Sequence, residues 1–239
     1  MRKVDQPSHP PGRTLRDPFA DRASLLCRTL LSQPGSEWSV RGLAQAAGVT
    51  PMLSSDVVRQ LEAAGIVNVQ AAGRRLSIRL VDPWGLLQQW TAVYRWTRNQ
   101  ALPFSVPVPD AERMIERVQR AAGKRRWALT LLAGAWQRIR YAPTERLHAY
   151  VECDDIDDLR ELAARQGWPE DAAGQLVLMK PAYRASVWHE TSAAVPSMAH
   201  IVSDLQLVLD LWHYPDRGRE TAEQLWRRLM RGFERTAHA

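Results

Sequence analysis

The residues with the clearest potential for chemistry are the five carboxylates between Glu152 and Asp158, which directly follow an apolar run. Metal-dependent nucleases and nucleotidyltransferases hold carboxylates at the end of such a strand. A polymerase-beta-type nucleotidyltransferase also needs a Gly-Ser turn ahead of its acidic pair, which this segment lacks. A restriction-type nuclease needs an acid two residues before a strand lysine, whereas Leu178 precedes Lys180. We therefore interpret the carboxylates as charges that complement the N-terminus of the following helix, and keep a metal-dependent nucleic-acid enzyme as the alternative.

Other reactive side chains show no catalytic or metal-binding spacing. The six histidines are scattered, Gly123-Lys124 lacks the rest of a phosphate-binding loop, and there is no Gly-x-Ser-x-Gly motif. Cys27 and Cys153 stand in different halves of the chain among apolar residues, so we expect buried thiols and no zinc site. We predict no catalytic residue, no metal and no cofactor.

A second group of residues fits nucleic-acid recognition. Thr50-Pro51 predicts the start of a helix, with an oxygen-bearing N-cap followed by proline at the first helical position. Val57, Val58 and Leu61 form its apolar stripe. The residues off this stripe, which are free to face DNA, are Thr50, Met52, Leu53, Ser55, Asp56 and Arg59. Among them, we expect Ser55 and Arg59 to be the best readers of bases or phosphates.

Basic side chains near this helix would add contacts to the DNA backbone. Arg74 and Arg75 stand at a glycine-containing hairpin tip, where they can reach a phosphate or a minor groove, although a solvated turn is the alternative. Arg41 begins the preceding helix. The N-terminal arm adds further phosphate contacts through Arg2, Lys3, Arg13 and Arg16.

The elements that would position these residues form a recognisable series. Apolar spacing predicts a helix from Phe19 to Leu30, and Ser39 is a plausible cap for a second, short helix. The helix that starts at Thr50-Pro51 ends at Gly65, and alternating residues over 66–69 and 76–80 predict a β-hairpin. Over about residues 18–82 this series resembles the winged helix-turn-helix of bacterial transcription regulators.

The rest of the chain predicts a mixed domain. We expect a helix after Asp82-Pro83, a proline-rich connection over 101–109, and helices over 111–122 and from Trp127 to about Ile139. Strands over 147–151 and 175–179 flank a helix near 156–166, and the last third is helical from Ile201. The predicted fold is therefore α+β and mostly helical. Its parts are a flexible basic arm (1–17), the winged helix-turn-helix (18–82), a helix and connection (83–109) and a C-terminal α/β domain with a helical end (110–239).

Charge supports this division of the 239 residues. The net charge of +6 is made of +6 over residues 1–100, +5 over 101–140 and −5 over 141–239. A basic front part favours binding to a polyanion. No apolar run approaches the ~20 residues that cross a bilayer, and the start resembles no signal peptide, so we expect a cytoplasmic protein with no membrane partner. Most of the ten tryptophans stand at helical-core spacing.

The C-terminal part is similar to the AbiEi family of transcriptional regulators and type IV toxin–antitoxin antitoxins. The resemblance covers most of residues 36–230 and is carried by Ala128-Leu129-Thr130, Tyr150-Val151, the strand at 176–181, and Gln206 with Leu209-Asp210-Leu211 followed by Arg217-Gly218, Glu220 and Ala222. Leu131 departs from the family, which often has glycine after the Thr130 position. We expect Asp210 to pair with Arg217 or Arg219 at the corner between the last two helices.

The resemblance implies a repressor that binds repeats in its own promoter and autoregulates its operon. It also implies a nucleotidyltransferase-type toxin encoded alongside, which the C-terminal domain counteracts. We expect double-stranded DNA as a partner, bound by a homodimer or by paired monomers. A solitary regulator without a toxin, and a protein-binding module without DNA specificity, stay open as alternatives.

Overall fold

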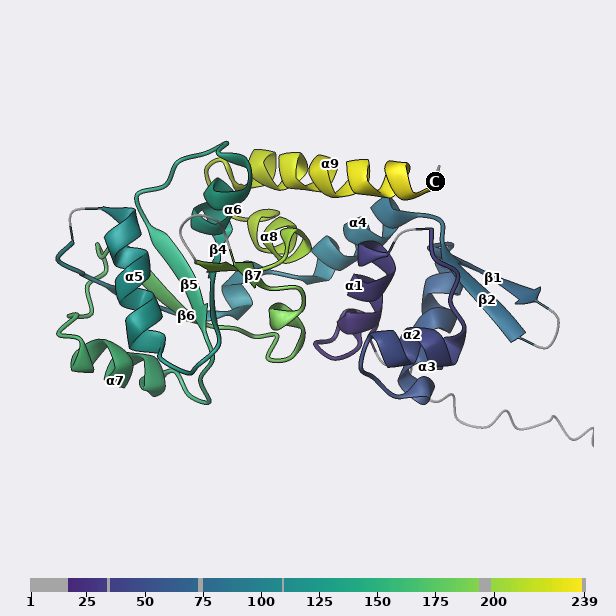
Figure 1. The fold of residues 1–239 in the computed structure, drawn as a ribbon, viewed down its shortest axis with the longest axis horizontal. Coiled ribbons are helices and arrows are strands. Elements are labelled where there is room, and N and C mark those ends of the chain that lie inside the picture. Colours follow the sequence, from purple (N-terminus) through teal and green to yellow (C-terminus); the bar gives the residue numbers. More distant parts are fainter. Residues whose placement is uncertain (1–16, 34, 73–74, 109, 194–198, 238–239) are drawn as a thin grey trace, which may run out of the picture.

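A computed structural model describes residues 17–33, 35–72, 75–108, 110–193 and 199–237. Its N-terminal part contains α1 (Ser24–Ser32), α2 (Val40–Ala46) and α3 (Pro51–Ala63), followed by the antiparallel hairpin of β1 (Val67–Ala72) and β2 (Arg75–Leu80). Figure 1 shows this hairpin projecting from one end of an elongated molecule, beside α2 and α3. Three helices followed by a hairpin agree with the predicted order of elements.

Local signals in the sequence set the ends of these helices. The Ser39 hydroxyl accepts a hydrogen bond from the Gly42 N–H at 3.0 Å, and the Thr50 hydroxyl accepts one from the Leu53 N–H at 3.3 Å. Gly65 has a φ of +71°, in the left-handed region that favours glycine at a helix end. Both predicted N-caps are confirmed. Trp38 also exchanges two backbone hydrogen bonds with Ile78, which ties the α1–α2 connection to the hairpin.

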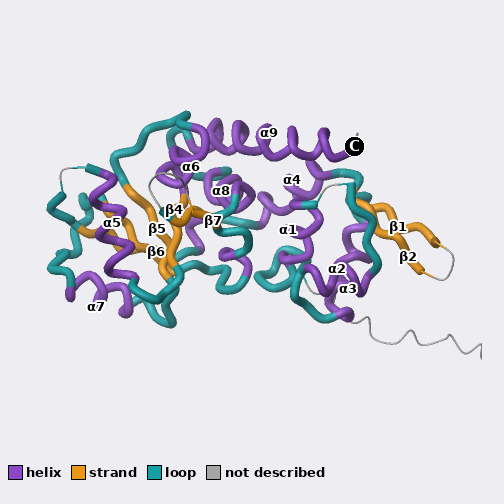
Figure 2. Tube along the Cα trace, in the orientation of Figure 1, coloured by secondary structure: helices purple, strands orange, loops and turns teal. Residues whose placement is uncertain are grey.

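The larger part of the chain is built on a mixed sheet. Its order is β3 (Gln100–Phe104), β6 (Leu176–Lys180), β5 (Leu147–Val151), β4 (Trp127–Thr130), β8 (His200–Ile201) and β7 (Ser192–Ala193). β5 is parallel to β6, and β4 is parallel to β8, while the other neighbours are antiparallel. Mixed sheets with short helices on their faces are typical of α+β folds. The predicted class, α+β and mostly helical, is confirmed (Figure 2).

Helices cover both faces of this sheet. Side chains of α5 (Ala111–Ala122) and α6 (Leu131–Ile139) lie on one face, with Leu129 and Leu147 beneath them, and α7 (Asp157–Arg165) packs nearby against β3 and β6. Alternate strand residues such as Tyr150 point to the other face, toward α8 (Asp204–Leu211). α6 follows β4 directly and also contacts α8. Gly134 allows this close approach, because an added Cβ would lie 2.8 Å from Leu207 Cδ2 of α8 and 3.0 Å from the Leu129 carbonyl oxygen.

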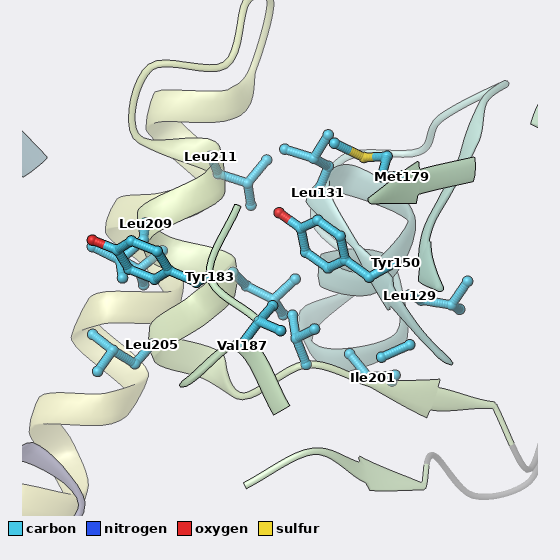
Figure 3. Close-up of a cluster of buried hydrophobic side chains, with 14 of the residues drawn as sticks. Leu129, Leu131, Tyr150, Met179, Tyr183, Val187, Ile201, Leu205, Leu209 and Leu211 are labelled. Carbon is cyan, nitrogen blue, oxygen red and sulfur yellow. The ribbon is translucent and has the colours of Figure 1, made fainter. Parts of the chain in front are cut away.

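The buried apolar side chains form a contiguous core that runs through both parts of the described chain. Leu26, Val57 and Trp90 belong to the same cluster as Leu178 and Leu209. Figure 3 shows the portion where side chains of α8 meet those of the strands. α4 (Pro83–Val93) connects the hairpin to the sheet, and α9 (Gly218–Ala237) extends from α6 toward the hairpin end. Among the described residues, no helix is both long and apolar enough to cross a membrane.

Three sequence predictions are wrong in this part of the fold. The connection predicted over 101–109 is a strand in its first half, since β3 pairs with β6 at the edge of the sheet, where Pro103 can lack an N–H. Residues 127–130 form β4 and not the start of a helix, because periodicity cannot distinguish a short apolar strand from a buried helix. Ile201 belongs to β8, and the helix that follows begins only after the Ser203 cap.

Asp210 does not pair with Arg217 or Arg219 as predicted. It is fully buried on α8, where Oδ1 accepts hydrogen bonds from Tyr94 Oη at 2.5 Å and Tyr150 Oη at 3.0 Å. The reason is that α8 is buried on all sides, so Asp210 faces the core. Arg217 instead bonds Glu220, and Arg219 bonds Glu223.

The Asp210 network continues into the N-terminal part. Gln206 Nε2 donates to Asp210 Oδ1 at 2.9 Å, and Gln206 Oε1 accepts from Nη2 of the buried Arg28 on α1 at 2.5 Å. Around it, Asp21 accepts the backbone N–H groups of Ala185 and Ser186. These polar contacts join α1 and the segment before it to the sheet domain. Because the partners of Arg28 and Asp21 lie far away along the chain, the sequence alone did not single out Arg28.

Candidate nucleic-acid interface

The outer face of α3 carries three of the predicted contact residues. Met52 is 65% exposed, Ser55 is half-buried, and the Arg59 side chain is 59% exposed. Their spacing of three and four residues places them on one face of the helix. The structure therefore brings Met52, Ser55 and Arg59 together on the side of α3 away from the core.

Leu53 and Asp56 are buried, which contradicts the prediction that their side chains are free to face DNA. Leu53 is 9% exposed because it lies one turn before Val57 on the buried stripe. Asp56 is 2% exposed, and its Oδ1 accepts a hydrogen bond from Arg59 Nη2 at 2.6 Å. Thr50 is exposed, but its hydroxyl accepts the Leu53 N–H as the helix cap.

The structure describes only some of the remaining predicted contact residues. Arg41 is exposed at the start of α2, which packs against α3. Arg74 lies outside the described residues, and Arg75 is described by its backbone only, as the first residue of β2. The arm residues Arg2, Lys3, Arg13 and Arg16 also lie outside the described residues.

Sequence reasoning missed one basic residue of the hairpin. Arg79 is exposed on β2 and forms an ion pair with Glu37, whose Oε2 also accepts a hydrogen bond from Ser77 Oγ at 2.9 Å. The hydrogen bond from Arg79, followed by that from Ser77, lowers the pKa of Glu37. The alternation of residues 76–80 contained the signal, because it places Ser77 and Arg79 on the same, solvent-facing side of the strand.

The carboxylates over 152–158 have partners that do not indicate catalysis. Glu152 pairs with Arg126, and Arg184 lies 2.6 Å from Asp154 Oδ1. Asp158 Oδ2 accepts the backbone N–H groups of Asp154 and Asp155 at 2.9 and 3.1 Å, at the start of α7. These backbone hydrogen bonds lower the pKa of Asp158. Within the described ranges, no group of three or more His, Cys, Asp or Glu residues could hold a metal ion.

Comparison with known families decides what kind of protein carries this interface. The model of the family described as "Transcriptional regulator, AbiEi antitoxin, Type IV TA system" matches residues 79–230. The chain belongs to this family. An AbiEi-family protein is a transcriptional regulator and antitoxin of a toxin–antitoxin system, and the family is one of regulators and not of enzymes. Comparisons with curated proteins and with solved structures give no match.

The structure explains the departure from the AbiEi pattern at Leu131. This residue has a φ of +51°, in the left-handed region, and is the first residue of α6, directly after β4. Glycine adopts this conformation without the steric cost that a Cβ adds. The glycine that the resemblance leads us to expect at this position would therefore have a conformational reason, whereas Leu131 adopts this backbone with a fully buried side chain.

Proposed function

We propose that this AbiEi-family regulator is a sequence-specific DNA-binding repressor that autoregulates its own operon. The observation that carries the proposal is the outer face of α3, where Met52, Ser55 and Arg59 lie together on a helix whose other face is anchored in the core. The major groove of DNA admits an α-helix and presents a distinct pattern of donors and acceptors for each base pair. An anchored helix with such a face is what direct readout requires.

The hairpin would bind next to α3 as a wing. Arg74 and Arg75 at its tip would contact the DNA backbone or the minor groove, and Arg41 at the start of α2 would contact a phosphate. Residues 1–100 carry a net charge of +6, whereas the last 99 residues carry −5. The charge asymmetry supports placing the DNA in contact with the N-terminal part.

We assign DNA binding to residues 18–82 and the antitoxin role to the C-terminal domain over 110–239. The antitoxin role is assigned because the family is described as one of antitoxins. The target of the antitoxin would be a nucleotidyltransferase-type toxin. Repeats in the promoter would be bound by a homodimer or by paired monomers. The rival proposal, a metal-dependent enzyme, has lost its structural support because the carboxylates over 152–158 are engaged by arginines and backbone N–H groups.

Fluorescence anisotropy with two DNA duplexes tests the proposal. One is the DNA upstream of the protein's own gene, and the other has the same composition in scrambled order. We expect the upstream DNA to bind at least about 10³-fold more tightly. Equal affinity for both duplexes would contradict sequence-specific binding, and cleavage or nucleotide transfer with Mg²⁺ or Mn²⁺, abolished by Asp155→Ala with Asp157→Ala, would establish the rival.

A salt titration of DNA binding tests the proposal that the hairpin acts as a wing. Arg74→Ala with Arg75→Ala should weaken binding to both duplexes and reduce the slope of log K against log salt by up to about 1.8, since each phosphate contact contributes about 0.9. Arg165→Ala removes an exposed arginine on the distant α7 and serves as the matched control. An unchanged slope in the double variant would show that the hairpin tip does not contact phosphates.

A further inference from the structure

The guanidinium of Arg59 is held along one of its edges by α3 itself. Nη2 donates to Asp56 Oδ1 at 2.6 Å, and Nε lies 3.4 Å from the Ser55 carbonyl oxygen as a longer hydrogen bond. Nε–H and the adjacent Nη2–H form the side edge of a planar guanidinium. Both hydrogen bonds therefore use this edge, so this edge of the guanidinium faces the helix.

The end of the guanidinium, in contrast, makes no hydrogen bond with the described residues. No hydrogen bond with a described residue engages Nη1, and the second N–H of Nη2 is also left over from the bond to Asp56. These two N–H groups form the end-on fork, which is parallel and points along the side chain. With the side chain 59% exposed, the fork lies on the outer face of α3 with Met52 and Ser55.

Asp56 is placed so that it orients Arg59 without facing a ligand. Its side chain is 3% exposed, whereas that of Arg59 is 59% exposed. A carboxylate at the surface of this face would repel the phosphates of DNA. A buried carboxylate avoids that repulsion and limits the rotamers of the arginine, which reduces the conformational entropy that binding removes.

We propose that Arg59 reads a guanine through its end-on fork, with Asp56 as its positioning residue. Two parallel N–H donors match guanine O6 and N7 in the major groove, which is the commonest specific contact of arginine with a base. This inference rests on the proposed DNA-binding function and names the base that one residue of the interface recognises. Ser55 and Met52 remain available for neighbouring bases.

The test is a guanine scan of the upstream duplex. Each guanine in turn is replaced by 7-deazaguanine, which lacks the N7 acceptor, and the Kd is measured for the full-length protein. For the wild type, at least one position should weaken binding about 5- to 150-fold. Arg59→Ala should bind the unmodified duplex about as weakly as the wild type binds the duplex with 7-deazaguanine at the sensitive position. The 7-deazaguanine substitution should not weaken the binding of Arg59→Ala any further.

Variants of Asp56 separate positioning from structure. Asp56→Asn keeps an acceptor for Nη2 and should retain most of the guanine effect, whereas Asp56→Ala should lose most of it while its affinity for scrambled DNA changes less than twofold. Circular dichroism and the melting temperature report whether Asp56→Ala still folds. If it does not, the comparison of Arg59→Ala with Arg59→Lys decides, because the single ammonium of lysine cannot make the bidentate contact.

The outcomes distinguish a failure of this inference from a failure of the proposed DNA-binding function. If the wild type does not distinguish the upstream duplex from the scrambled one, the proposed function fails. If it does, but no guanine position depends on Arg59, the guanine assignment is overturned. An equal loss on all sequences in Arg59→Ala, with a salt slope smaller by about 0.9, would show that Arg59 binds a phosphate instead.

Discussion

Replacing Asp210 by asparagine perturbs the centre of the buried polar network. Oδ1 accepts hydrogen bonds from Tyr94, Tyr150 and Gln206, and Oδ2 accepts one from Thr130 Oγ1 at 2.5 Å. The carbonyl oxygen of asparagine can keep the first three. Its NH₂ group must then face the Thr130 hydroxyl, which can no longer donate to this position.

The magnitude follows from the charge that is lost. A hydrogen bond to a charged group contributes about 1.5–3 kcal/mol. Removing one partner of a buried ion pair costs about 3–5 kcal/mol, because the other charge is left uncompensated. Here that charge is the guanidinium of Arg28, which is 1% exposed and linked to Asp210 through Gln206. Because the two effects overlap, we expect Asp210→Asn to lower the free energy of unfolding by about 3–5 kcal/mol.

Urea unfolding followed by tryptophan fluorescence measures this free energy. The melting temperature should fall by about 6–20 °C, from roughly 2–4 °C per kcal/mol for a chain of this length. The control is Asp154→Asn, since the Asp154 side chain is 98% exposed and its ion pair with Arg184 is screened by water. Its midpoint should not change.

A nearly neutral Asp210→Asn would refute the reasoning. Burial raises the pKa of Asp210 above its usual value, and the hydrogen bonds from Thr130, Tyr94, Tyr150 and Gln206 offset only part of this rise. Were the carboxyl protonated in the folded protein, asparagine would resemble it closely in shape and charge. The loss would then stay below about 1 kcal/mol, and Arg28 would have no buried counter-charge.

Three further predictions concern single buried residues. Burial, and then the charge of Arg146, lowers the pKa of His148 to about 4, so between about pH 6.5 and 4 the unfolded chain binds more protons than the folded one. The free energy of unfolding should therefore fall by up to about 3 kcal/mol as the pH falls through this range. In urea titrations, a smaller fall for His148→Asn than for the wild type would confirm His148 as the source, and an identical fall would exclude it. Leu131→Gly should be more stable than Leu131→Ala by about 1 kcal/mol in urea unfolding, reversing the usual order, because only glycine relieves the left-handed backbone. Cys27 is fully buried and its pKa is raised to about 12 by burial, so iodoacetamide should label it only in denaturant; labelling of the native protein at Cys27 would contradict its placement in the core.

The parts of the fold that the sequence predicts are those with local causes. The caps at Ser39 and Thr50 each accept an N–H three residues later, so the signal and its partner lie within one turn. Gly65 likewise marks a helix end through its own backbone. Such features need no knowledge of the rest of the molecule, and the structure confirms them.

The parts that the sequence does not predict depend on distant contacts. Pro103 is compatible with a loop until β6 pairs with it at a sheet edge. Only Gln206, four residues earlier on α8, is a local partner of Asp210. The other three, Tyr94 just after α4, Thr130 of β4 and Tyr150 of β5, lie far away along the chain, and no spacing points to them. Likewise, Arg28 is an arginine in an apolar helix whose partner, Gln206, is 178 residues away. Long-range pairing of this kind leaves no local pattern.

The candidate interface was partly predictable because helical periodicity is also local. Met52, Ser55 and Arg59 follow from the position of the apolar stripe. Leu53 could also have been placed correctly, since Leu53, Val57 and Leu61 follow one another at intervals of four residues on one face. The burial of Asp56 beneath Arg59 required the three-dimensional structure, because an aspartate in this position of a helix is most often exposed.

The most direct test of DNA reading by α3 places a negative charge on its outer face. Ser55→Glu adds a carboxylate between Met52 and Arg59 without removing a buried group, and Ala164→Glu adds the same charge to the exposed face of α7 as a matched control. The measurement is the Kd of each variant for the upstream duplex. We predict that Ser55→Glu weakens binding at least about 100-fold through repulsion in the groove, with Ala164→Glu within about twofold of the wild type. Unchanged binding by Ser55→Glu would contradict the account, because the DNA would then lie elsewhere on the protein.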